Sequence, residues 1–138
     1  MKPEVWGPHA WIFLHSITLE YPDQPTIDEK KNMATFINSL GLILPCQKCR
    51  INFNYHLQQY PLNDTVLQNK TNLVKWMIDI HNCVNEMTNK RKLSYENGLQ
   101  EILKLYNENN NKLIITIAII FIIVIIFLLI LNIFYLRT

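Results

Sequence analysis

Cysteine is scarce in this chain, with only Cys46, Cys49 and Cys83 among its 138 residues. Three cysteines allow one pair with one left over, which excludes the disulfide frameworks of many small secreted domains. Acidic and basic residues are interspersed, and the net charge is only +2. The sequence therefore shows no basic footprint, and we expect no nucleic-acid partner.

Strand patterns, internal repeats and an N-terminal secretory signal are also missing from the sequence. No alternation of apolar and polar residues is long enough for a strand. The first residues run through Pro3, Glu4 and Trp6 rather than through a basic region and an apolar stretch. We therefore expect a helical protein whose folded part faces the cytosol.

Charge is absent over residues 113–136, where nearly every residue is Ile, Leu, Phe or Val. This run exceeds the roughly 20 residues that cross a bilayer core. We predict a single membrane-spanning helix over 113–136, with the folded domain on the cytosolic side. The stretch 109–112 opens with three asparagines and predicts a short polar linker. The folded domain is then expected over residues 1–108, enough for one small core.

Apolar residues that recur every three or four positions predict five helices in this domain. Local signals mark their ends: Pro8 suits a first helical position, Thr26 and Glu29 form a capping box, and Gly41 suggests a stop. The predicted ranges are 8–20, 26–41, 46–60, 71–88 and a shorter helix that begins after Ser94. The fold class is all-α, a four-helix bundle with a short fifth helix. The inward side of that fifth helix is expected to be Leu99, Ile102, Leu103 and Tyr106.

Cys46 and Cys49 form a Cys-x-x-Cys motif at the start of the third predicted helix. At positions i and i+3 both sulfurs share one face and can close a disulfide ring. The unpaired N–H groups of the first turn, together with the helix dipole, stabilise a thiolate there. The motif is therefore typical of a redox pair.

Two alternatives remain open from the cysteines alone. Cys-x-x-Cys also forms half of many zinc sites, and here His56 or His81 would complete the ligand set of a membrane-tethered module. The chain has no second Cys-x-x-Cys and no histidine pair with the usual zinc spacing. The third possibility is a membrane adaptor without redox activity.

Aromatic and polar residues on the predicted helices suit a wide, flat cofactor. A flavin ring needs flat apolar walls and a few hydrogen-bonding groups at its edges. Each such residue alone is more typical of a core, and spacing shows only that His81 and Asn85 share a helix face. The candidate walls and polar contacts are Trp11, Trp76, Tyr95, His15, His81, Asn82 and Asn85.

Three sequence blocks, taken in order, carry a family resemblance. They are Trp6-Gly7-Pro8-His9-Ala10-Trp11-Ile12-Phe13-Leu14-His15, the Cys46 and Cys49 motif, and His81-Asn82-Cys83-Val84-Asn85. Tyr21-Pro22-Asp23 follows the first block, and Lys90 follows the last. From Trp6 to Tyr106 the chain resembles the flavin-linked sulfhydryl oxidases of the Erv/ALR family.

The resemblance implies one FAD at the mouth of a four-helix bundle. It also implies that Cys49 is the flavin-proximal sulfur and Cys46 the distal one. Protein dithiols would be oxidised, with electrons passing through this pair and the flavin to molecular oxygen, which becomes hydrogen peroxide. The implied cofactor contacts are Gly7, Trp11, His15, Tyr21, Trp76, His81, Asn82, Asn85, Lys90 at the phosphates, and Tyr95.

The chain departs from many cellular members of that family. It lacks the second cysteine pair that shuttles electrons from substrate, and we interpret Cys83 as a small buried residue. Short members without a shuttle occur in large DNA viruses, so a host or virion membrane is the expected location. By resemblance we also expect a non-covalent homodimer.

Overall fold

The computed structural model describes residues 1–135, and no strand occurs among them, so the all-α prediction is confirmed. The chain divides into two units, residues 1–102 and the residues from 103 onward. The elements are α1 (Pro3–Leu19), α2 (Ile27–Ile43), α3 (Gln47–Gln59), the 3-10 helix η1 (Val66–Gln68), α4 (Lys70–Met87) and α5 (Tyr95–Tyr135).

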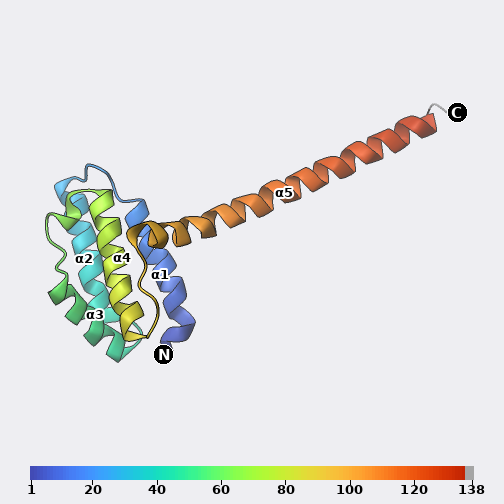
Figure 1. Ribbon diagram of the computed structural model, residues 1–138. Coiled ribbons are helices and arrows are strands. Elements are labelled where there is room, and N and C mark those ends of the chain that lie inside the picture. The colour runs from blue at the N-terminus through green and yellow to red at the C-terminus, as the bar shows by residue number, and fades with distance from the viewer. Residues whose placement is uncertain (136–138) are drawn as a thin grey trace. The chain divides into compact units, whose positions relative to one another are not determined.

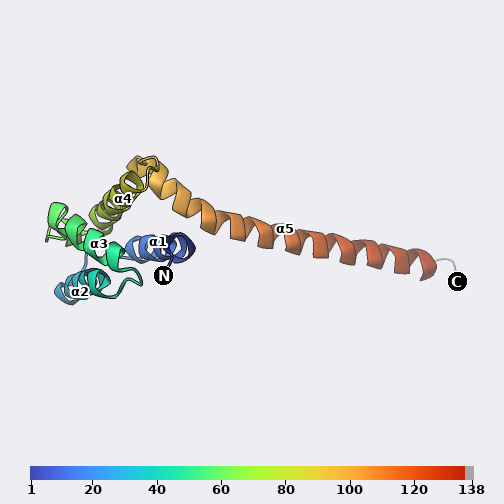
Figure 2. The ribbon, with the colours of Figure 1, turned by 90° about the horizontal axis from the view of Figure 1, so that it is seen from below.

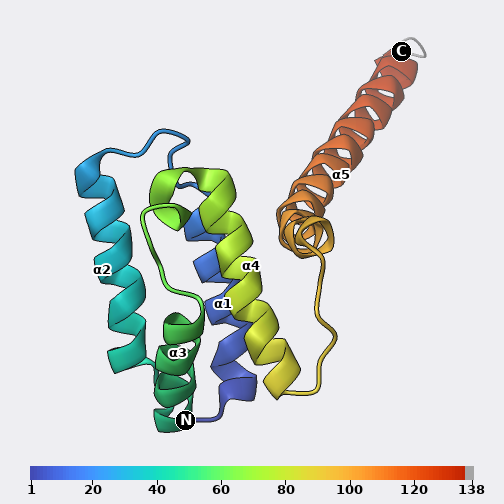
Figure 3. The same cartoon turned by 60° about the vertical axis from the view of Figure 1, so that its left-hand side comes forward.

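Helices α1 to α4 lie side by side and alternate in direction (Figure 1). α4 packs against α1 and α3, and α3 packs against α2, as the view from below also shows (Figure 2). Because of this alternation, the first turns of α1 and α3 lie at the same end of the bundle as the last turns of α2 and α4 (Figure 3). The three sequence blocks reach this end from different helices.

The core of the bundle lies between these helices and is closed by η1. Ile37, Leu73, Met77 and Ile80 are almost completely buried, as the helical periodicity predicts for Leu73 and Met77. The threonine at position 18 is also fully buried, with its hydroxyl donating to the backbone oxygen of His15 at 2.8 Å. The rest of the buried apolar cluster is Leu14, Tyr21, Leu40, Phe53, Leu67 and Trp76.

The first helix begins earlier than its sequence signals suggest. α1 starts at Pro3, and Pro8 lies inside the helix instead of at its first position. Pro8 has no N–H for the carbonyl of Glu4, so one intrahelical hydrogen bond is lost, but Pro3 takes the favourable first position. The first sequence block is consequently helical throughout.

The second helix confirms one boundary prediction and corrects another. Thr26 and Glu29 form the capping box: the Glu29 N–H donates to Thr26 Oγ1 at 3.2 Å, and the Thr26 N–H donates to Glu29 Oε2 at 2.7 Å. Gly41 does not end the helix, which continues to Ile43. A Cβ at Gly41 would collide with the side chain of Asn54 on α3. Gly41 therefore permits close packing of α2 and α3.

The fifth helix starts as predicted, with the Asn97 N–H donating to Ser94 Oγ at 3.2 Å. It is not short, because α5 continues through residues 109–112 to Tyr135. No proline or glycine interrupts that polar stretch. Ile102 is buried as expected; Tyr106, in the second unit, is 47% exposed, and its inward position stays a prediction.

Within the described residues, α5 is the one helix long and apolar enough to cross a membrane. Its side chains are exposed from Lys112 to Leu129. A core helix of a soluble protein can be as long and as apolar, but its apolar stretch would be mostly buried. None of the apolar stretch of α5 is buried. The membrane span remains a prediction, and its last residue, Leu136, lies outside the described residues.

Candidate active site

The start of α3 carries a disulfide between Cys46 and Cys49, whose Cα atoms are 5.1 Å apart. Cys46 is the N-cap of the helix, and its sulfur accepts a hydrogen bond from the Cys49 N–H at 3.2 Å. Both residues are half-buried. The first-turn N–H groups and the helix dipole stabilise negative charge on a sulfur at this place.

A ring cluster joins α1 to α4. Trp11 stacks on His81, with ring centroids 4.0 Å apart and planes 10° from parallel. His15 Nε2 lies 3.0 Å from His81 Nδ1, a hydrogen bond between the two imidazoles. The structure thus brings together three residues that the sequence analysis selected from segments far apart in the chain.

Both imidazoles of this cluster are neutral at pH 7. Burial lowers the pKa of His15 to about 4. The pKa of His81 is also lowered to about 4, first by burial and then by the nearby His15 and the positive charge of Lys90. A neutral imidazole has one N–H donor and one acceptor nitrogen, so the pair can hydrogen-bond and still offer polar atoms to a ligand.

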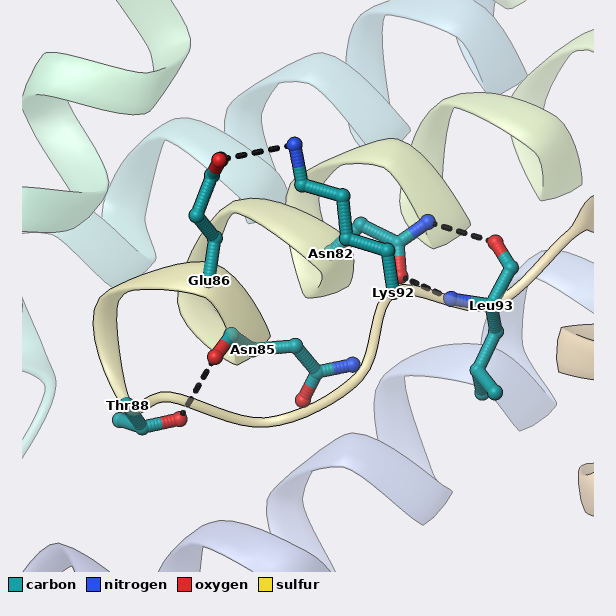
Figure 4. Close-up of polar contacts among 6 residues, drawn as sticks. All are labelled: Asn82, Asn85, Glu86, Thr88, Lys92 and Leu93. Atoms are coloured by element: carbon teal, nitrogen blue, oxygen red, sulfur yellow. Dashed lines mark hydrogen bonds and ion pairs between the residues drawn. The ribbon is translucent and has the colours of Figure 1, made fainter.

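The loop after α4 is fixed to the helix by Asn82 (Figure 4). The Asn82 side chain donates to the Leu93 carbonyl at 2.8 Å and accepts from the Leu93 N–H at 2.9 Å. Glu86 and Lys92 form an ion pair at 2.8 Å nearby, but both side chains are more than half exposed, so this pair adds little stability. The two hydrogen bonds of the Asn82 side chain therefore hold Leu93 of this loop against α4.

The last turn of α4 places Asn85 and Lys90 close together. The Asn85 backbone oxygen accepts from the Lys90 N–H at 2.7 Å and from Thr88 Oγ1 at 3.2 Å. Between them, Asn89 has a positive φ of 54°, a left-handed conformation that asparagine tolerates at a helix C-terminus. The turn directs the chain back along α4 and positions Lys90 where its charge acts on His81.

A small cavity adjoins the histidine pair, between α4 and the first turns of α5. Gly98 faces it, and a Cβ at that position would lie 3.2 Å from Ile78. The remaining lining is His15, Ile78, His81, Asn82, Leu93, Glu101 and Ile102.

Three predicted cofactor residues have their polar groups bound within the fold. The Tyr21 hydroxyl donates to the Leu67 carbonyl at 3.0 Å, and the Trp76 indole N–H donates to the Tyr60 carbonyl at 3.0 Å; both side chains are core residues. The Tyr95 hydroxyl donates to Asp79 at 3.0 Å. A cofactor contact by any of the three stays a prediction.

Two features of the first turns of α1 are not satisfied by contacts within the described part of the chain. Apart from its two chain neighbours and the nearby backbone of α1, no heavy atom of the described residues lies within 4 Å of a Cβ placed at Gly7. The Trp6 indole nitrogen is buried but has no hydrogen-bond partner among the described residues. In the sequence, Trp6 stands out only as part of a motif; its unpaired indole N–H becomes visible only in the folded structure.

His56 on α3 is the other residue with a buried nitrogen, Nε2, that lacks a partner in the described part of the chain. Burial lowers the pKa of His56. The zinc alternative paired it with the two cysteines, which here bond to each other. Within residues 1–135, no group of three His, Cys, Asp or Glu side chains is arranged to hold a metal ion.

Cys83 lies on α4 and is half-buried, with a free thiol. Burial is the largest influence on this thiol and raises its pKa. A raised pKa leaves little thiolate at neutral pH, which is the reactive form. Cys83 is thus less buried than the sequence analysis expects, and its raised pKa does not favour a reactive role.

Comparison with known proteins assigns the chain to a family. The model of the Erv1/Alr family matches residues 8–106. A probable FAD-linked sulfhydryl oxidase of Acanthamoeba polyphaga mimivirus is 50% identical over 104 residues, which cover 75% of this chain and 73% of that protein. The mitochondrial FAD-linked sulfhydryl oxidase ERV1 of Saccharomyces cerevisiae is 34% identical over 89 residues, 64% of this chain but only 46% of the yeast protein.

Solved structures agree with the sequence matches. The crystal structure of the yeast Erv1 core superposes with a TM-score of 0.66 and 30% identity, covering 73% of this chain and 83% of the yeast core. The similarity to the yeast core therefore extends over most of the folded unit. That unit contains the helix bundle, the disulfide and the three sequence blocks. The chain belongs to the Erv1/Alr family.

Proposed function

We propose that this protein is an FAD-dependent thiol oxidase that forms disulfides in dithiol substrates. The observation that carries the proposal is the Cys46–Cys49 disulfide at the first turn of α3, in a member of the Erv1/Alr family. It lies at the bundle end where α1 begins and α4 ends (Figure 3). Residues of those two helices form the ring cluster.

The residues present fit an FAD. Trp11 and His81 offer flat ring surfaces, and neutral His15 and His81 offer polar nitrogens. The buried Trp6 N–H needs an acceptor, and the open space at Gly7 allows close approach of a ligand. We assign further contacts to Asn82, Asn85 and Lys90, as the family resemblance implies. When bound, FAD supplies a two-electron acceptor that passes electrons to molecular oxygen, giving hydrogen peroxide.

The disulfide performs the exchange with substrate. A substrate thiolate attacks the Cys46 sulfur; the Cys46–Cys49 bond breaks, and a mixed disulfide forms while Cys49 leaves as a thiolate. The second substrate thiol then attacks the substrate sulfur that is bonded to Cys46 and releases Cys46. The substrate thereby gains a disulfide, and Cys46 and Cys49 together gain two electrons. Stabilisation of the Cys49 thiolate by the α3 N-terminus makes it a better leaving group.

A visible absorption spectrum combined with an oxygen electrode tests this function. The purified full chain is expected to be yellow, with the absorption of an oxidised flavin, and to consume oxygen when dithiothreitol is added. A colourless protein that consumes no oxygen would favour the zinc-binding or adaptor alternatives. A metal measurement on the same sample separates those two.

The same proposal places the enzyme on a membrane through 113–136, with its folded domain in the cytosol. The exposed apolar side chains of α5 support the anchor. The matched mimivirus protein supports a viral setting, hence a host or virion membrane. In such a setting the enzyme would introduce disulfides where host reductants oppose them.

We also propose a non-covalent homodimer. Phe13 on α1 is 59% exposed and meets Phe36 of α2 edge to face, so these two helices present an apolar surface. Light scattering of the detergent-solubilised chain, with the detergent contribution subtracted, is expected to give twice the chain mass with and without reductant. A dimer that reductant dissociates would instead indicate a Cys83–Cys83 bridge, and a monomer under both conditions would contradict the proposal.

A further inference from the structure

Two side chains of α3 hydrogen-bond to the backbone at the end of α2, just before Cys46. Arg50 Nη1 donates to the Leu44 carbonyl at 2.5 Å, and Asn54 Nδ2 donates to the Gly41 carbonyl at 3.1 Å. Arg50 and Asn54 are four residues apart and so lie on one side of α3. Leu44 is the C-cap of α2, and only Pro45 separates it from Cys46.

These hydrogen bonds matter because the connection between α2 and α3, residues 44–46, makes few other hydrogen bonds. The last carbonyls of a helix have no intrahelical partner, and Pro45 has no N–H to donate. The Leu44 N–H still bonds to the Leu40 carbonyl at 3.1 Å, and the Cys46 carbonyl accepts from the Arg50 N–H at 3.0 Å. Arg50 thus contacts both sides of the connection, with its backbone at Cys46 and its charged side chain at Leu44.

We propose that Arg50 is a positioning residue that holds Cys46 next to Cys49 while their disulfide is open. The inference rests on the proposed function, in which Cys46 spends part of each cycle bonded to substrate. In that state the covalent link from Cys46 to Cys49 is gone. The half-buried guanidinium still ties the residue before Pro45 to α3, and a hydrogen bond with a charged donor is stronger than a neutral one.

The expected consequence is a coupling between the Arg50–Leu44 hydrogen bond and the disulfide. When the disulfide is closed, Leu44 is already held near Arg50, so the hydrogen bond forms at little cost in chain entropy. By reciprocity, the hydrogen bond favours closure of the disulfide by the same factor. Removing the Arg50 side chain should therefore weaken the disulfide relative to the dithiol.

The experiment measures this equilibrium directly. The full chain with its FAD is held without oxygen in glutathione buffers, in which the Cys46–Cys49 dithiol and one glutathione disulfide exchange to give the protein disulfide and two glutathione thiols. Acid quenching, alkylation and mass spectrometry then count the open pairs. Arg50→Met is compared with Lys48→Met, because both remove one positive charge from the same turn and only the first removes the hydrogen bond to Leu44.

We expect Arg50→Met to lower the equilibrium constant for disulfide closure about tenfold, and Lys48→Met to change it by less than about threefold. Equal effects of the two variants would overturn the proposal and leave only a general charge effect. If Arg50→Met does not fold by circular dichroism, Arg50→Gln against Lys48→Gln makes the same comparison. Equal melting losses for oxidised and reduced Arg50→Met, with an unchanged equilibrium constant, would indicate a merely structural role and also overturn it.

This test is independent of turnover. If the wild-type chain binds no flavin and consumes no oxygen, the proposed function fails, whereas the effect of Arg50 on the Cys46–Cys49 equilibrium can still be measured in the absence of FAD. Conversely, an active yellow enzyme whose Arg50→Met variant keeps the wild-type equilibrium constant would retain the function and lose the positioning role.

Discussion

His15 and His81 lie 66 positions apart in the chain and share a hydrogen bond of 3.0 Å between Nε2 and Nδ1. One ring must donate and the other accept, which requires the accepting ring to be neutral. Burial keeps both rings in that form by lowering each pKa to about 4. The bond therefore depends on pH.

The first prediction concerns acid stability. An unfolded histidine has a pKa near 6.5. Between about pH 6.5 and 4, His15 and His81 therefore bind protons in the unfolded chain but stay neutral in the folded protein. Stability should be constant above pH 6.5 and fall below it by up to about 1.4 kcal/mol per pH unit for each histidine. Urea unfolding at a series of pH values measures this slope. His15→Gln should flatten it; an unchanged slope in that variant would assign the acid sensitivity elsewhere.

Much of the fold follows from local signals in the sequence. The capping box at Thr26, the Ser94 cap and the helical start at Cys46 depend on residues within one turn, and the structure has all three. Gly41 shows the limit of such signals. A glycine near a helix end suggests a stop, but the close approach of Asn54 on another helix explains this one.

The site could be predicted only in part for the same reason. Spacing placed Cys46 and Cys49 on one face, but it could not bring Trp11 against His81, which depends on how α1 packs on α4. Only the family resemblance grouped those residues. The partners of Tyr21 and Trp76 are backbone carbonyls, which no side-chain pattern reveals.

The second prediction separates cofactor residues from core residues. A ligand that binds only the folded state at a thousandfold excess over its Kd adds about 4 kcal/mol of stability. His81→Ala and Asn85→Ala should therefore lose flavin and melt at lower temperature. Tyr21→Phe removes a buried hydroxyl bonded to Leu67 and should cost about 1 kcal/mol. The flavin-to-protein absorbance ratio and the melting temperature decide: lower flavin occupancy in Tyr21→Phe would support its predicted cofactor contact, and full occupancy would make Tyr21 a core residue only.

The third prediction concerns the cysteines. Cys46→Ser and Cys49→Ser should abolish oxygen consumption with dithiothreitol, because only this pair forms a disulfide. Cys83→Ser should retain it, since the raised pKa of that thiol leaves little thiolate. Cys46→Ser leaves a thiolate at Cys49, so it should show a long-wavelength charge-transfer band that Cys49→Ser lacks. A folded, yellow and inactive Cys83→Ser would refute the two-cysteine mechanism.

The fourth prediction concerns membrane topology. If 113–136 spans the bilayer with the folded domain in the cytosol, protease added to intact vesicles should digest the domain and spare a small tag placed after the span. Asn63 and Asn69 both lie in Asn-x-Thr sequences, so glycosylation at either would report a lumenal domain. Protection of the domain, or a glycan, would overturn the topology and the proposed substrate compartment together.

The last prediction compares two helical glycines. Glycine inside a helix costs about 0.5–1 kcal/mol relative to alanine, and no side chain within residues 1–135 occupies the space that a Cβ at Gly7 would take. Gly7→Ala should therefore stabilise the flavin-free protein by about that amount. If the cofactor approaches Gly7 closely, the same methyl group should weaken FAD binding, so the two quantities should move in opposite directions.

Gly41→Ala is the matched control for this comparison. Its methyl group would displace the Asn54 side chain and break its 3.1 Å hydrogen bond to the Gly41 carbonyl, which offsets the gain in helix propensity. The flavin-free Gly41→Ala protein should therefore be less stable than Gly7→Ala by about 1 kcal/mol, the contribution of one such bond. Urea unfolding and FAD titration of both variants measure these effects. A Gly7→Ala protein with wild-type FAD affinity would remove Gly7 from the cofactor site, because the space at its Cβ would then not be used by the ligand.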